Sequence, residues 1–118
     1  MTLISLQRAL AQFAVEREWE QFHTPKNLVM ALAGESGELV EIFQWLTPEE
    51  SAHVMQDDER AVQVREELAD VLAYLLRLAD VLNIDLEHAL AEKIEKNRHK
   101  YPVHLARGKA DKYTQLGG

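Results

Sequence analysis

Two pairs of carboxylates with the same spacing are the residues best suited to chemistry. Glu35 and Glu38 lie three positions apart, and Glu67 and Asp70 repeat that spacing. Because residues three apart in a helix project from one face, each pair would point in one direction. Inward carboxylates repel one another unless a cation joins them, and such hard oxygen ligands suit magnesium or manganese. The spacing therefore predicts a site for Mg²⁺, or for Mn²⁺, between two helices.

Glu35 differs from an ordinary surface glutamate because it interrupts an apolar row. That row consists of Leu28, Leu32, Leu39, Ile42 and Leu46. Position 35 is the missing member of the row, so a glutamate occupies a core position. A buried carboxylate is costly unless it is paired or bound to a metal. A single Glu-x-x-Glu is common on solvated helices, but this placement favours a metal site.

The elements that must position these carboxylates are helices. The apolar spacing predicts one short helix and four main ones, at 48–55 and at 5–20, 25–46, 58–82 and 86–100. Thr24-Pro25 and Thr47-Pro48 mark two starts, since a threonine N-cap precedes a proline at the first helical position. Residues 103–118 are interpreted as a C-terminal tail. No strand pattern is present, so the predicted fold is an all-α helical bundle in a single domain, 1–118.

The long helix expected at 58–82 is apolar nearly all round. From Leu68 to Leu82, its only charged residues are Asp70, Arg77 and Asp80. Beside the carboxylate pair runs a seam made of Val64, Leu68, Val71, Leu75, Leu78 and Leu82. A helix of this kind must be buried on nearly every side, and one chain has too few helices to cover it. The pattern predicts a homo-oligomer with this helix at a subunit interface.

The composition narrows the classes of protein. The 118 residues are 47% hydrophobic and 28% charged, as in ordinary globular domains, and the net charge is −7. That charge disfavours a nucleic acid polymer or an anionic membrane as partner. Without cysteine, disulfides, thiolate metal sites and cysteine nucleophiles are excluded. No apolar run suits a membrane span or a signal peptide, so we expect a cytoplasmic protein.

The charge is unevenly distributed along the chain. Residues 1–92 carry 6 basic and 18 acidic side chains, whereas residues 93–118 carry 7 basic and 2 acidic ones. Lys93, Asn97 and Lys100 share one face of the last helix and could hold phosphate oxygens. A solvated basic face, favoured by the helix dipole, is the alternative.

Aromatic residues near the carboxylates are candidates for contacts with a substrate. Trp19, Phe22 and Trp45 could stack on a base, although tryptophans near helix ends more often belong to a core or an interface. Tyr74 lies one turn after Asp70 and is either a core tyrosine or a phosphate contact.

Together these segments resemble the MazG-like all-α nucleoside triphosphate pyrophosphohydrolases. The resemblance is carried by Glu-x-x-Glu within 33–41, by Phe43-Gln44-Trp45, and by Glu-x-x-Asp within 66–72. The segment at 16–23, which contains Trp-Glu-Gln-Phe-His, and the ending at 97–107 resemble the dCTP pyrophosphatase branch. The similarity covers residues 5–115.

The resemblance implies a dimer or tetramer that hydrolyses a nucleoside triphosphate, dCTP or a related dNTP, to the monophosphate and pyrophosphate in nucleotide-pool housecleaning. It implies Mg²⁺ held by Glu35, Glu38, Glu67 and Asp70. It places the base near Trp19, His23 and Trp45. It places the phosphates near Lys93 and Asn97, with Tyr74 adjacent.

Physical chemistry is consistent with that reaction. A triphosphate carries about four negative charges, so an acidic pocket would repel it unless cations mediate the contact. A metal also lowers the pKa of a bound water and orients that water for in-line attack. A carboxylate that is not fully used as a ligand can take the proton, and Glu38 is the candidate for this catalytic role.

Three other functions stay open. The first is a pyrophosphohydrolase with broad or modified-nucleotide specificity. The second is a di-iron carboxylate bundle, which needs two Glu-x-x-His motifs. Glu20 and His23 have that spacing but run into Pro25, and at Asp85 and His88 an aspartate replaces the glutamate. The third, a non-catalytic oligomerisation module, explains the apolar helix but not the glutamate in the core row.

Overall fold

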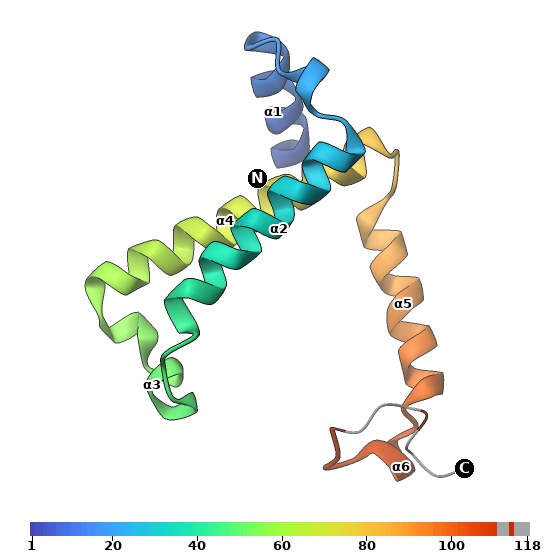
Figure 1. Cartoon of the computed structure of the whole chain (residues 1–118). Helices are drawn as coiled ribbons and strands as arrows, with labels where there is room; N and C mark the ends of the chain where they lie inside the picture. The colour runs from blue at the N-terminus through green and yellow to red at the C-terminus, as the bar shows by residue number, and fades with distance from the viewer. Residues whose placement is uncertain (111–113, 115–118) are drawn as a thin grey trace. The chain divides into compact units, whose positions relative to one another are not determined.

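Every regular element in the computed structural model, which describes residues 1–110 and 114, is helical (Figure 1). In chain order they are α1 Leu3–Glu16, η1 Glu20–Phe22, α2 Pro25–Phe43, α3 Pro48–Ala52, η2 Val54–Gln56, α4 Asp58–Val81, α5 Leu86–Lys100 and α6 Val103–Ala106, where η denotes a 3-10 turn. The all-α prediction is confirmed, with the four main helices and the short α3. No helix in this part of the chain is long and apolar enough to cross a membrane.

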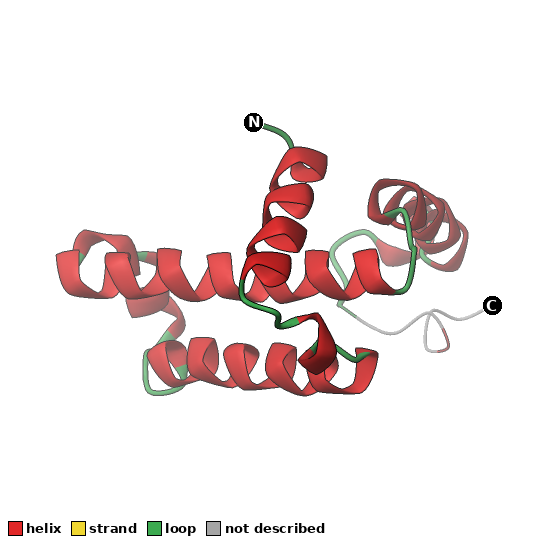
Figure 2. Ribbon diagram, turned by 90° about the horizontal axis from the view of Figure 1, so that it is seen from above, coloured by secondary structure: helices red, strands yellow, loops and turns green. Residues whose placement is uncertain are grey.

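The chain divides into two compact units, Met1–Asn83 and Ile84–Gly118. In the first unit α2 and α4 lie side by side and antiparallel (Figures 1 and 2). Among the residues that the structure describes, the buried apolar side chains all belong to this unit and are Ala14, Leu28, Val54, Ala61, Val64, Leu76 and Ala79. Helix α1 also packs on α4, where Gln7 Nε2 donates a hydrogen bond of 2.8 Å to the Leu76 carbonyl. The α2–α4 pair is therefore the frame on which the carboxylates are placed.

Side-chain caps set the start of each main helix. Thr24 accepts a hydrogen bond from the backbone N–H of Asn27 in the first turn of α2, and Thr47 forms a reciprocal capping box with Glu50. Asp57 and Asp85 are the N-caps of α4 and α5, and the side chain of each accepts one hydrogen bond from a backbone N–H in the first turn of its helix. Each such cap stabilises its helix by about 1 kcal/mol. The starts of α2 to α5 agree with the sequence because capping depends on only a few neighbouring residues, whereas α1 begins at Leu3, after its N-cap Thr2, rather than at the expected Ser5.

The end of α1 differs from the expectation. The apolar spacing predicts a helix to Glu20, but α1 ends at Glu16, and Glu18 adopts a left-handed conformation with φ 53°. The Trp19 N–H bonds to the Ala14 carbonyl, and the Glu18 N–H bonds to that of Val15, which makes a Schellman motif. The Trp19 ring packs edge-on against Phe13 at 5.6 Å between centroids. Because a glutamate stands where glycine is usual, sequence inspection missed this stop.

Two further differences concern the ends of elements. Helix α2 ends at Phe43 rather than Leu46, because Thr47 must be extended before Pro48 (φ −70°, ψ 161°). The expected tail at 103–118 contains the four-residue helix α6, and its residues 111–113 and 115–118 lie outside the described part of the chain.

The long helix α4 exposes about half of its expected seam. Val64 is buried and Val71 and Leu78 are partly buried, whereas Leu68, with 53% of its surface exposed, and Leu75 lie on the exposed side. On an all-apolar helix the spacing alone does not say which of two neighbouring rows faces the core. An apolar groove of about 410 Å³ runs between α1 and α4, lined by Leu6, Ala9, Leu10, Phe13, Ala69, Leu72, Ala73 and Leu76.

In the second unit, most side chains of α5 are charged or polar. Helix α5 has no buried residue, and its last turn is basic, with Arg98, His99 and Lys100. Positive charge there complements the partial negative charge at a helix C-terminus. Lys93 and Asn97 are both exposed on this helix.

Candidate active site

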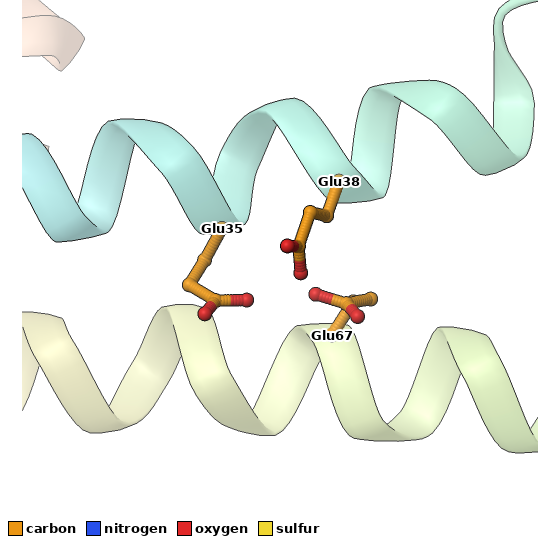
Figure 3. Close-up of side chains that lie close together, drawn as sticks. All are labelled: Glu35, Glu38 and Glu67. Carbon is orange, nitrogen blue, oxygen red and sulfur yellow. The ribbon is translucent and has the colours of Figure 1, made fainter.

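Three carboxylates converge between the two framing helices. Figure 3 shows Glu35 and Glu38 projecting from α2 toward Glu67 on α4. One oxygen from each lies within 4.8 Å of the others. The apolar row of α2 explains the approach, since Leu28 is buried and the other row members are partly buried, which turns position 35 toward α4. The placement of Glu35 on the packed face is thus as expected.

The electrostatics of this cluster are unfavourable for three bare charges. Glu35 Oε2 and Glu67 Oε2 are buried and have no hydrogen-bond partner within the described residues. Burial, together with the neighbouring carboxyls of Glu35 and Glu38, raises the pKa of Glu67 to about 7. The Glu67 carboxyl lowers the pKa of Glu35, but burial, Glu38 and Asp70 outweigh it, and that pKa is also raised.

The donor set fits a metal ion. Two orphaned, buried carboxylate oxygens and a third, exposed carboxylate supply the hard, charged ligands that divalent cations such as Mg²⁺ prefer. A bound cation would neutralise the repelling charges and would take the place of the extra proton on Glu67. The triad of Glu35, Glu38 and Glu67 can therefore bind a metal. Asp70 is not part of the triad, although its charge acts on Glu35.

A pocket of about 170 Å³ adjoins the triad. It contains five of the residues singled out in the sequence, together with Leu10, Phe13, Ala73 and Arg77. Those five are Trp19, His23, Glu35, Asp70 and Tyr74. Glu35 belongs to both the triad and the pocket, so a molecule in the pocket would lie against the metal-binding carboxylates. The Trp19 and His23 rings meet edge to face, 6.5 Å apart.

Arg77 was not among the expected site residues. Its Nε donates a hydrogen bond of 3.1 Å to His23 Nδ1, and its terminal nitrogen forms an ion pair of 3.0 Å with Asp80. Burial lowers the pKa of His23, the Arg77 charge lowers it further, and Glu20 opposes both. The available signal was that Arg77 is one of three charges on the apolar stretch of α4, two turns after Asp70.

Three expected contacts are not brought into this pocket. Trp45 follows the end of α2 and is 86% exposed. Lys93 and Asn97 belong to α5 in the second unit. Their expected contacts with a substrate remain predictions.

Known proteins are similar to this chain in both sequence and fold. The MazG-like family model matches residues 31–116. The dCTP pyrophosphatase 1 of Rattus norvegicus is 52% identical over 116 residues, which cover 98% of this chain and 68% of the relative. The human dCTP pyrophosphatase 1 is 48% identical over 115 residues, with the same two coverages.

A solved structure supports the same relationship. A crystal structure of a pyrophosphatase from Archaeoglobus fulgidus superimposes with a TM-score of 0.78 at 44% sequence identity, covering 83% of this chain and 90% of the other. These matches span most of the chain, including both carboxylate pairs. The resemblance noted in the sequence is confirmed, and the chain belongs to the MazG-like family.

Proposed function

We propose that this protein hydrolyses dCTP to dCMP and pyrophosphate, with a divalent cation held by the carboxylates of α2 and α4. The observation that carries the proposal is the shared position of Glu35, which belongs both to the triad and to the pocket lined by Trp19 and His23. A nucleotide spanning the two would place its phosphates at the cation and its base in the pocket. The curated relatives are named dCTP pyrophosphatases.

The carboxylates would share the tasks of holding the cation and accepting a proton. Glu35, Glu67 and Asp70 hold the cation, which we propose to be Mg²⁺ or, as a substitute, Mn²⁺. When bound, the cation neutralises phosphate charge and lowers the pKa of a water molecule. Glu38 is the exposed member of the triad. It serves as ligand and as the acceptor of the proton released when water attacks and the bond between the α- and β-phosphates breaks.

The remaining candidates surround the nucleotide. Trp19, His23 and Trp45 contact the base, Tyr74 lies beside the phosphates, and Lys93 and Asn97 of α5 bind phosphate oxygens. Residues 1–118 then act as one catalytic domain. We also retain the cytoplasm as the expected compartment, because the nucleotide pool that such an enzyme would clean is found there.

The active form is proposed to be a homo-oligomer, a dimer or a tetramer. The exposed apolar side chains of α4 and the apolar groove beside α1 would otherwise face water. Light scattering at micromolar concentration should give a multiple of the 13.5 kDa chain mass. A stable monomer would refute this part of the proposal.

A substrate screen tests the activity. The purified protein is incubated with each dNTP, each NTP and the common modified dCTPs in the presence of MgCl₂, and monophosphate and pyrophosphate are both measured. The expected result is dCMP with an equal amount of pyrophosphate, and no reaction in excess chelator. A higher rate with another base or with a modified nucleotide would correct the substrate. Release of phosphate alone, or no hydrolysis by folded protein, would contradict the proposed reaction.

A further inference from the structure

The pairing of Arg77 with His23 determines which nitrogen of the imidazole carries hydrogen. A guanidinium has N–H donors and no acceptor, and it is never deprotonated in proteins. Because Arg77 Nε donates to Nδ1, that nitrogen must be the acceptor. In a neutral imidazole the hydrogen is then on Nε2, which makes Nε2 a donor. The lowered pKa of His23 agrees with a neutral ring.

The α4 member of this pair, Arg77, is held in place by burial. The Arg77 side chain is only 11% exposed, and it also forms an ion pair with the more exposed Asp80, one turn further along α4. His23 lies between η1 and α2, 54 residues away in the sequence. Both side chains line the pocket that also contains Trp19. The imidazole is thus oriented by a residue that also lines the pocket.

A fixed donor has a definite consequence for the choice of pyrimidine. Cytosine and thymine both carry an acceptor at O2, so a donor at that atom cannot tell them apart. At the 4-position a donor would favour the oxygen of thymine over the amino group of cytosine. At N3 cytosine is an acceptor and thymine is a donor. A donor can therefore select cytosine over thymine only by facing N3.

We propose that Arg77 is a positioning residue for substrate selection, which holds His23 as the Nε2–H tautomer so that His23 donates to N3 of cytosine. This inference rests on the proposed function for its substrate, but the tautomer itself does not. Arg77 acts through His23, not on the reacting phosphate. A purely structural Arg77, tying the loop before α2 to α4, would change stability and leave the selection between bases unaltered.

The tautomer is tested first, on the unmodified protein and without any activity measurement. Long-range ¹H–¹⁵N NMR of the histidine side chains distinguishes protonated from unprotonated ring nitrogens, and His23→Gln identifies the His23 signals among the 5 histidines. At about pH 8 we expect Nδ1 unprotonated and Nε2 protonated. A protonated Nδ1 would overturn the proposal whether or not the protein hydrolyses dCTP.

The selection is tested with Arg77→Met, which keeps an apolar stem and removes the donor. Asp80→Asn is the matched control, since it removes the charge paired with Arg77 but leaves the bond to Nδ1. For Arg77→Met we expect kcat/KM for dCTP to fall on the order of fivefold, mainly through KM, with a smaller fall for dTTP. Asp80→Asn should keep the ratio of the two substrates. An unchanged ratio in folded Arg77→Met would overturn the proposal.

A double-mutant cycle separates action through His23 from an independent effect. In a His23→Gln background the donor no longer depends on a tautomer, so Arg77→Met should change the dCTP-to-dTTP ratio little further. An equal, additive change in that background would overturn the positioning role. If no nucleotide is hydrolysed by the unmodified protein, the proposed function fails, and the His23 NMR signals, compared between the unmodified protein and Arg77→Met, still decide whether Arg77 fixes the tautomer.

Discussion

The α2–α4 pair and helix α5 carry opposite charge and hold it in different ways. Between α2 and α4, packing pushes carboxylates together until two of their oxygens are buried without partners. On α5 no residue is buried, and the basic side chains are exposed. In the acidic region the exact positions of the carboxylates therefore matter, because a small shift of one of them would change how it binds a metal ion. On α5 the exposed basic side chains are expected to act mainly through their charge. Substitutions in the two regions should therefore differ in how strongly, and in which way, they change activity.

The largest effect is expected at the centre of the triad. Glu67→Gln keeps the shape of the side chain but removes a charged metal ligand, so kcat should fall by roughly 100-fold or more. The folded state without metal should be as stable or more stable, because the substitution removes like-charge repulsion. Steady-state kinetics with MgCl₂ and thermal unfolding in chelator measure the two effects. Full activity in Glu67→Gln would remove the triad from the mechanism.

Tryptophan substitutions compare a packed side chain with an exposed one. Trp19 lines the pocket and packs against Phe13, whereas Trp45 is 86% exposed. If both stack on the base, either alanine variant should weaken substrate binding by roughly 1–3 kcal/mol, similarly for every base. Only Trp19→Ala should also lower the melting temperature, since it alone is packed. KM for dCTP, dTTP and dATP provides the comparison, and unchanged values in Trp45→Ala would exclude Trp45 from the site.

On α5 the expected effect is smaller and depends on salt. Lys93→Ala should raise KM for dCTP by roughly tenfold through loss of one contact to phosphate. Arg98→Ala is the control, because it removes the same charge from a different face of the helix and breaks only an exposed ion pair with Glu95. Equal changes in the two variants would mean that α5 attracts the substrate by charge alone. No change in either would leave it outside the site.

The difference between local and long-range contacts explains which features could be predicted from the sequence. Glu35 was found because one apolar row on α2 made its position unusual, and the helix starts were found because Thr24 and Thr47 cap locally. The pairing of Arg77 with His23 was missed because it joins residues 54 positions apart. The side of α4 that faces the core was also ambiguous, since its expected seam contains both Val64, which is buried, and Leu68, which is exposed.

The smallest expected effect is a dependence of stability on pH, confined to the acidic region. The pKa of Glu67 is about 7 in the folded protein, against an ordinary value of 4.5. The folded state therefore keeps a proton that the unfolded chain releases above its ordinary pKa. The resulting stabilisation is complete below about pH 4.5 and is lost as the pH rises through about 7.

In excess chelator, the melting temperature should accordingly be higher near pH 5.5 than near pH 8. Glu67→Gln has no carboxyl to titrate, so its melting temperature should change less over that range and serves as the control. Mg²⁺ should recover the loss at pH 8, because it binds the deprotonated carboxylates and thereby takes the place of the proton. If the two proteins show the same dependence on pH, then Glu67 is not the group responsible. In that case the charge of the triad is relieved in the folded state by something other than a proton on Glu67.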